Sequence, residues 1–240
     1  MLNALIDLLF PPLCHHCRTF MPKDGRALVC DECLATSRPV QSPMCTVCGV
    51  PLLTEGGIDH PCGDCLTGKP AFAAARAPFV YEGAIKDLIH RLKYNAKVQL
   101  RRPLALLTAE RLKGFVDDAA PELLLPVPLH VKRLRQRGFN QAALLAELLS
   151  KEWQLPLVRQ GLRRTRWTEP QVNLAAAERA ANVRGAFTVT DVAAVNGKRL
   201  LLVDDVLTTG STIAECSRVL KRAGAGAVFA VTVARVPGVG

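Results

Sequence analysis

The sequence lacks any apolar run long enough to cross a membrane, although 49% of its 240 residues are hydrophobic and its mean hydropathy is +0.16. Its first thirteen residues are apolar, but they have no basic segment and include Asp7, so they make a poor secretory signal. We expect them to form a short amphipathic helix docked on the protein. These absences favour a folded, cytoplasmic protein whose thiols stay reduced.

The sequence also lacks an evident Ser/His or Cys/His arrangement of the kind that activates a nucleophile. Two of its five histidines, His90 and His130, are interpreted as structural or surface residues rather than as bases. Any reaction would therefore have to proceed without a strong nucleophile from the protein.

Cysteine, by contrast, is abundant: eight of the nine cysteines form four Cys-x-x-Cys pairs. The pairs are Cys14/Cys17, Cys30/Cys33, Cys45/Cys48 and Cys62/Cys65. Under reducing conditions this spacing indicates zinc rather than disulfides. The last two pairs repeat the first two at offsets of 31 and 32 residues, which suggests two successive ribbons with four cysteines and one Zn²⁺ each. A cross-braced arrangement, first pair with third, is the alternative.

The cysteine pairs define a module over residues 1–70, followed by a second domain over residues 71–240. A module of this size has too few core residues to fold without metal. A purely structural role for this module and a role in binding nucleic acid or a protein partner have equal weight. The ninth cysteine, Cys216, is expected to be buried and inert.

The second domain is organised around the stretch Leu200–Thr212. Its four apolar residues, Leu200–Val203, predict a strand buried on both faces of a parallel sheet, ended by Asp204 and Asp205. A short loop follows, and residues 213–223 predict a helix. The loop consists of Val206, Leu207, Thr208, Thr209, Gly210, Ser211 and Thr212.

This layout predicts a site for a sugar 5′-phosphate. Ligands of open α/β sheets bind beyond the carboxyl ends of the strands, and the start of a helix favours phosphate. The hydroxyl groups of the loop add donors, and Gly210 permits close approach of the backbone. Asp204 and Asp205 are suited to accept hydrogen bonds from the vicinal hydroxyls of a ribose.

Basic residues are concentrated in the second domain, where residues 76–240 hold 26 Lys/Arg and 14 Asp/Glu. This excess favours an anionic partner, although a solvated basic surface is equally compatible with it. Residues 130–140 are expected to form a loop that binds pyrophosphate, and residues 163–171 a lid or a platform for a nucleobase. Their candidate residues are Lys132, Arg133, Arg135, Arg137, Arg166 and Trp167.

Apolar periodicity predicts an α/β fold for this domain. Strands are expected at residues 77–82, 123–129, 186–189, 200–203 and 227–234, and helices at residues 83–94, 103–115, 141–153 and 174–183. Strands that alternate with helices imply a mostly parallel sheet flanked by helices.

The stretch Leu200–Thr212 resembles the phosphoribosyl-pyrophosphate (PRPP) signature of type I phosphoribosyltransferases, and nearly the whole chain resembles the ComF family. The other matching motifs are Leu8–Cys14, the doubled cysteine pairs, Pro126–Leu129, Arg137–Gln141, and the series Gln171, Arg179, Asn182 and Phe187.

The resemblance implies a type I phosphoribosyltransferase fold behind a double zinc ribbon, with Mg²⁺ accompanying PRPP and Asp204 and Asp205 as catalytic residues. The implied PRPP-binding residues are Val203, Asp204, Asp205, Thr208, Thr209, Gly210, Ser211 and Thr212. It also implies a link to natural competence, through incoming single-stranded DNA or growth on DNA. The alternatives are a non-catalytic single-stranded DNA-binding protein that uses the pocket for a nucleotide phosphate, and a scaffold that docks other competence proteins.

Overall fold

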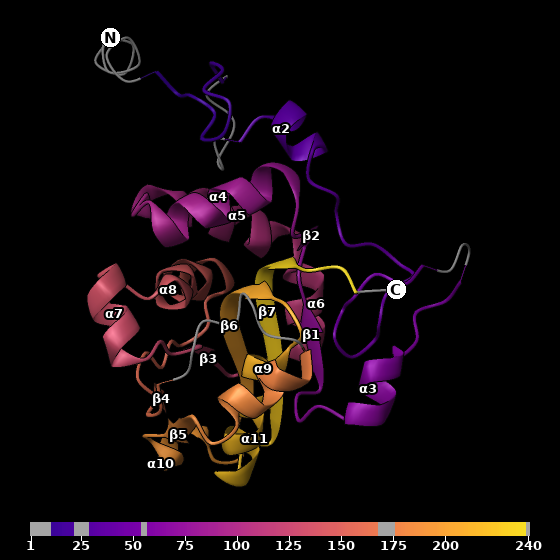
Figure 1. Cartoon of the computed structure of the whole chain (residues 1–240), viewed down its shortest axis with the longest axis vertical. Coiled ribbons are helices and arrows are strands. Elements are labelled where there is room, and N and C mark those ends of the chain that lie inside the picture. The colour runs from indigo at the N-terminus through magenta and orange to yellow at the C-terminus, as the bar shows by residue number, and fades with distance from the viewer. Residues whose placement is uncertain (1–10, 22–28, 54–56, 168–175, 239–240) are drawn as a thin grey trace.

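A computed structural model describes residues 11–21, 29–53, 57–167 and 176–238 (Figure 1). Most of the expected N-terminal helix, residues 168–171 of the second basic segment and residues 174–175 lie outside these ranges. Within them, no helix is both long and apolar enough to span a bilayer. The elements are α2 (Asp31–Ala35), α3 (Gly63–Gly68), β1 (Ala74–Arg76), β2 (Phe79–Val80), α4 (Gly83–Tyr94), η1 (Val98–Leu100), α5 (Arg101–Arg111), α6 (Lys113–Ala119), β3 (Leu123–Pro126), α7 (Val131–Arg137), α8 (Gln141–Trp153), β4 (Leu162–Arg164), α9 (Ala176–Val183), β5 (Phe187–Val189), α10 (Val192–Val195), β6 (Arg199–Leu207), α11 (Ser211–Arg222) and β7 (Ala227–Arg235).

The main sheet is parallel throughout, with the strand order β1-β7-β6-β3 and β2 paired with the far end of β7. This arrangement confirms the predicted α/β fold. The short strand β5 was expected in the same sheet, but it pairs antiparallel with β4 in a separate two-stranded sheet.

The central strand β6 is buried on both faces because helices cover each side of the sheet. Leu201 and Val203 belong to the apolar cluster formed with α4, α5 and α8. Leu200 and Leu202 belong to the cluster that contains Ile213 and other residues of α11. Figure 1 shows α4 and α5 toward the top of the sheet and α9 and α11 toward the bottom.

Three local predictions are corrected. The strand does not end at the two acids, because β7 is long enough to keep pairing with β6 as far as Leu207 and Arg235. The helix expected over residues 103–115 is two helices, α5 and α6, because the backbone at Leu112 (φ −103°, ψ 9°) leaves the helical range. Residues 77–82 contain only the short β2, preceded by Pro78, which cannot donate a ladder hydrogen bond.

The basic segment 130–140 is also not a loop, because most of it forms the helix α7. The side chain of His130 caps its start by accepting a hydrogen bond from the Lys132 amide at 3.2 Å. Gly138 ends it in the left-handed region at φ +81°. A lone basic run gave no apolar periodicity from which this helix could be predicted.

The zinc module and the sheet domain share an interface at the start of α4. The backbone amides of Ala84 and Ile85 donate to the hydroxyls of Thr36 and Ser37, at 3.1 and 3.0 Å. Gly83 permits this approach, since it has φ +55° and a Cβ there would lie 2.0 Å from the carbonyl oxygen of Thr36. The hydroxyls that cap α4 therefore come from the cysteine module, and the domain boundary at residue 70 stays a prediction.

Candidate functional site

A cavity of about 580 Å³ opens at the carboxyl end of β6. It is the size of a pocket that takes a small organic ligand. Its polar and aromatic lining residues are Tyr81, His90, Lys93, Tyr94, Arg133, Arg137, Gln141, Arg164, Asp204, Asp205, Thr208 and Thr212. The structure thus brings both predicted acids, part of the predicted loop and two of the predicted cations to one cavity.

The two acids have different environments because neighbouring residues of a strand point to opposite faces. Asp205 is 3% exposed and forms an ion pair with Lys93 of α4, with 2.9 Å between Nζ and Oδ2. Burial disfavours the charge on Lys93, but the attraction of Asp205 outweighs it, so the pKa of Lys93 is raised. Lys93 therefore neutralises the charge of Asp205 directly, and that of Asp204 only from a greater distance.

Burial and the repulsion of Asp205 raise the pKa of Asp204 to about 7, and the more distant Lys93 offsets only part of this effect. The backbone amide of Asp205 donates to Asp204 Oδ1 at 2.9 Å. Near neutral pH, Asp204 therefore holds a proton for much of the time. An added positive charge in the cavity would favour its release.

The loop after β6 presents the start of α11 to the same cavity. Gly210 is the N-cap residue at φ +80°, and α11 has no side-chain cap. The hydroxyls of Thr209 and Ser211 lie 2.8 Å apart, while Thr208, Gly210 and Thr212 line the cavity itself. The Ser211 amide donates to Thr209 Oγ1 at 3.5 Å. The backbone amides, the hydroxyl groups and the positive end of the helix dipole together suit an anion of phosphate type.

Only two of the cations predicted on residues 130–140 reach the cavity. Arg133 and Arg137 line it, whereas Lys132 and Arg135 are exposed on α7 and are not among its lining residues. Arg137 donates to Gln141 Oε1 at 2.6 Å, and its Cζ lies 5.5 Å from the centre of the Tyr94 ring. One face of α7 therefore serves the pocket and the other faces solvent.

The remaining predicted residues lie outside the lining. Trp167 contacts α7, with its ring 5.3 Å from that of His130 and 5.8 Å from Lys132 Nζ. Arg166 donates to the carbonyl oxygens of Asn182 and Arg184, which ties its segment to the end of α9. Val203 is buried at 1% exposure and supports the site from within β6.

Sequence reasoning missed Lys93 and Arg164. Lys93 was not among the candidate cations, yet it follows the buried Ile85 and Ile89 at a spacing of four residues. Arg164 was placed in a loop, yet it follows the buried Leu162 at a spacing of two in β4. Each cation thus continues the buried face of its element, and this signal was available in the sequence.

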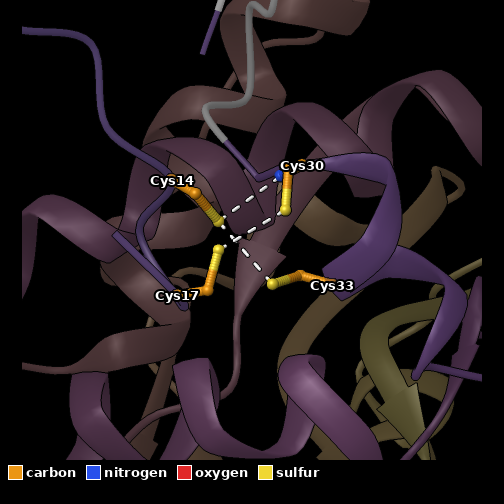
Figure 2. Close-up of side chains that lie close together, drawn as sticks. All are labelled: Cys14, Cys17, Cys30 and Cys33. Carbon is orange, nitrogen blue, oxygen red and sulfur yellow. Dashed lines mark hydrogen bonds between the residues drawn. The ribbon is translucent and has the colours of Figure 1, made fainter. Parts of the chain in front are cut away.

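The eight paired cysteines form two clusters, and in each the four sulfur atoms all lie within 4.8 Å of one another. Figure 2 shows the first cluster. The clusters are Cys14, Cys17, Cys30, Cys33 and Cys45, Cys48, Cys62, Cys65. The sequential pairing is confirmed and the cross-braced alternative is wrong.

The geometry of both clusters fits zinc. A tetrahedral site with Zn–S bonds of about 2.3 Å needs sulfur atoms about 3.8 Å apart. The distance between Sγ atoms is 3.8 Å for Cys14 and Cys33, and 3.7 Å for Cys48 and Cys62. Backbone amides also donate to Cys45 Sγ at 3.2 and 3.3 Å, which stabilises a thiolate. Four thiolates would fill each ion's coordination, as in structural sites.

Two protein-family models match the chain: the double zinc ribbon domain over residues 5–66, and the phosphoribosyl transferase domain over residues 134–238. Together with the sheet and the two cysteine clusters, they define the class: a phosphoribosyltransferase-type domain joined to a double zinc ribbon.

Full-length relatives give the family. The DNA utilization protein YhgH of Escherichia coli (strain K12) is 34% identical over 228 residues, which cover 92% of this chain and 96% of that one. Competence protein F of Haemophilus influenzae is 33% identical over 88% of this chain and 91% of its own. Competence protein ComFC of Streptococcus pneumoniae is 28% identical, over 85% and 86%. The chain belongs to this ComF family of competence and DNA utilisation proteins.

The cysteine clusters predict two zinc ions per chain. Replacing one ligand of one cluster, as in Cys17→Ser or Cys65→Ser, is expected to leave one ion, because three thiolates hold zinc less tightly than four. Elemental analysis of the purified protein measures the stoichiometry. Cys216→Ala is the matched control and should retain two ions. Unchanged zinc content in both ligand variants would contradict the assignment.

The raised pKa of Asp204 predicts an unusual dependence of stability on pH. The folded protein keeps a proton that the unfolded chain releases above about pH 4, so this group makes folding less favourable as the pH rises from about 4 to 7. The side chain of Asp204→Asn stays neutral at every pH. The unfolding free energy of this variant minus that of wild type should therefore increase by roughly 1–3 kcal/mol between pH 5 and pH 8. Urea denaturation with exposed Asp118→Asn as control measures this, and a difference that does not vary with pH would refute it.

Proposed function

We propose that the protein binds PRPP, or a ribose 5-phosphate group, in the cavity at the end of β6. The observation that carries this proposal is the placement of Asp204 and the buried Asp205 beside the start of α11, in one cavity. The ribose hydroxyls would donate to the acids, and the 5′-phosphate would accept from the loop over residues 208–212. Both halves of such a ligand find complementary groups in one cavity.

The charges of the site support a ligand that arrives with a cation. Lys93 neutralises Asp205, but the raised pKa of Asp204 means that the charge of this second acid is only partly compensated. Carboxylates are the ligands that Mg²⁺ prefers, together with substrate phosphates. Mg²⁺ would supply the missing charge when it binds with PRPP, while Arg133 and Arg137 would contact the pyrophosphate.

We propose phosphoribosyl transfer as the activity. The bond between C1 of the ribose and the pyrophosphate oxygen would break, the pyrophosphate would leave with the electron pair, and a nitrogen or oxygen of the acceptor would bond to C1 and lose its proton. This chemistry needs no protein nucleophile. The chain's part is to hold the ribose on its acids and to stabilise the negative charge that develops on the leaving group with its arginines.

Isothermal titration calorimetry with PRPP and Mg²⁺ tests the binding. Wild type is expected to bind with micromolar affinity, since several hydrogen bonds to charged groups contribute about 1.5–3 kcal/mol each. Asp204→Asn/Asp205→Asn should weaken binding at least about tenfold, whereas the exposed pair Asp117→Asn/Asp118→Asn should not. Absence of binding by wild type would overturn the proposal. If wild type does bind PRPP, a screen for pyrophosphate release with bases, amines and DNA ends would identify the acceptor.

A second candidate function, binding of single-stranded DNA, is favoured by the outer side of α7. Lys132 and Arg135 are exposed there, and the ring of the half-buried Trp167 lies 5.8 Å from Lys132 Nζ and 5.6 Å from Arg133 Cζ. Cations around an aromatic ring suit a strand whose bases stack and whose phosphates are neutralised. The relatives named for DNA utilization agree with such a partner.

Salt titration tests this candidate. The logarithm of the affinity for a single-stranded oligonucleotide should fall linearly with the logarithm of salt concentration, and Lys132→Ala/Arg135→Ala should reduce the slope by roughly one to two. The charge-matched control is Lys151→Ala/Arg222→Ala on other helices, which should retain the wild-type slope. Binding that is independent of salt, or equally impaired in the control, would count against the α7 surface.

A further inference from the structure

A buried arginine connects the second cysteine cluster to the loop that follows β6. Arg235 is the last residue of β7 and is 7% exposed. Its Nη2 donates to Cys48 Sγ at 3.7 Å. Its Nη1 donates to the carbonyl oxygens of Leu207 and Val236, both at 3.1 Å, and to that of Thr208. One guanidinium therefore contacts a cysteine of the cluster and the first residues of the phosphate-type loop.

The charge of Arg235 makes this contact depend on metal. Within the described part of the chain, no carboxylate lies in ion-pair contact with its guanidinium, and its Nε has no hydrogen-bond acceptor. A buried cation without a counter-charge is costly. Four cysteine ligands around one Zn²⁺ would fix the position of each sulfur and leave the site with a net negative charge. A loaded second site would thus supply the negative charge that Arg235 otherwise lacks.

The packing around the second cluster points to the same loop. Cys45 and Cys48 share an apolar cluster with Leu207 and Ile213, which flank the loop. Phe72 belongs to that cluster too, and its Cζ lies 4.0 Å from the position a Cβ on Gly210 would take.

The first cluster packs elsewhere. Cys14 and Cys33 lie in the cluster formed with α4 and α5, and His16 beside them reaches Asp87 of α4 at 3.2 Å. The two sites are therefore not equivalent in their relation to the loop, so the first site provides an internal control for the second.

We infer that Arg235 is a positioning residue that couples metal occupancy of the second four-cysteine site to the conformation of the loop over residues 207–212. Metal in that site holds Arg235, and Arg235 holds the carbonyl groups from which the loop begins. By thermodynamic reciprocity, a ligand that orders the loop must in turn strengthen metal binding at the second site. This ligand effect rests on the proposed function, whereas the structural coupling does not.

Hydrogen–deuterium exchange of the ligand-free, full-length protein tests the coupling itself. Cys65→Ser disables the second site without removing the contact residue Cys48, and Cys17→Ser is the matched variant of the first site. Amides of residues 207–213 should exchange at least about fivefold faster in Cys65→Ser than in Cys17→Ser. Arg235→Lys should also show faster loop exchange while it retains two zinc ions, because a lysine keeps the charge but cannot bridge both partners.

Unchanged protection of β3 and α8 would show that the variants are folded. If Cys65→Ser fails to fold, the loop exchange of Arg235→Lys, measured with both zinc ions bound, still tests the coupling. Equal loop exchange in Arg235→Lys and wild type would overturn the inference.

Zinc release to a chromogenic chelator tests the reciprocal effect. In Cys17→Ser the released metal comes from the second site, and in Cys65→Ser it comes from the first. Saturating ribose 5-phosphate should slow release from the second site at least about fivefold, leave the first unchanged, and lose its effect when Arg235→Lys is added to Cys17→Ser. Equal slowing at both sites would overturn the coupling. If calorimetry shows that wild type binds neither PRPP with Mg²⁺ nor ribose 5-phosphate, the proposed function fails, and the exchange experiment alone decides on Arg235.

Discussion

The alternation of side chains along β6 is the constraint on which the site depends. Because successive residues point to opposite faces, the two adjacent acids have different nearest neighbours although both line one cavity. Asp205 turns to the face covered by α4 and finds Lys93 there at 2.9 Å. Asp204 turns the other way and is left with burial and the repulsion of its neighbour, which raise its pKa to about 7. The pocket therefore contains one satisfied acid and one that favours an incoming positive charge.

The zinc module supports this site from two directions. The first ribbon packs on α4, whose first amides donate to Thr36 and Ser37, and α4 carries Lys93 at its other end. The second ribbon packs beside the loop after β6, through Phe72 and the contact between Cys48 and Arg235. The first cysteine cluster thus supports the helix that carries Lys93, and the second supports the loop after β6. This explains why the module is part of the domain's core although none of its described residues lines the cavity.

Local patterns predicted what depends on local physics. The helices at residues 83–94 and 141–153 have the predicted bounds, because apolar spacing and the capping residue Asn140 fix them. The cysteine spacing likewise predicted both metal clusters. Two of the failures depend on contacts between distant segments: the extension of β6 requires β7 beside it, and Trp167 lies against His130 rather than over the pocket. Lys93 and Arg164 were missed because the candidate cations were chosen from basic runs and not from the spacing of buried residues.

The state of Asp204 also separates the two candidate ligands of the pocket. The terminal phosphate of a nucleic acid would satisfy the start of α11, but it would bring another negative charge toward an acid that already resists ionisation. A pyrophosphorylated pentose bound with a divalent cation satisfies both ends, since its cation offsets the charge on Asp204 while its 5′-phosphate occupies the loop. These charges support the PRPP-type ligand as the proposed occupant of the pocket and the outer side of α7 as the proposed surface for DNA. The two proposed surfaces meet at Arg133, which lines the cavity and also lies 5.6 Å from the Trp167 ring. Arg137 lines the cavity, whereas Lys132 and Arg135 are exposed on α7, so the two partners would overlap at Arg133.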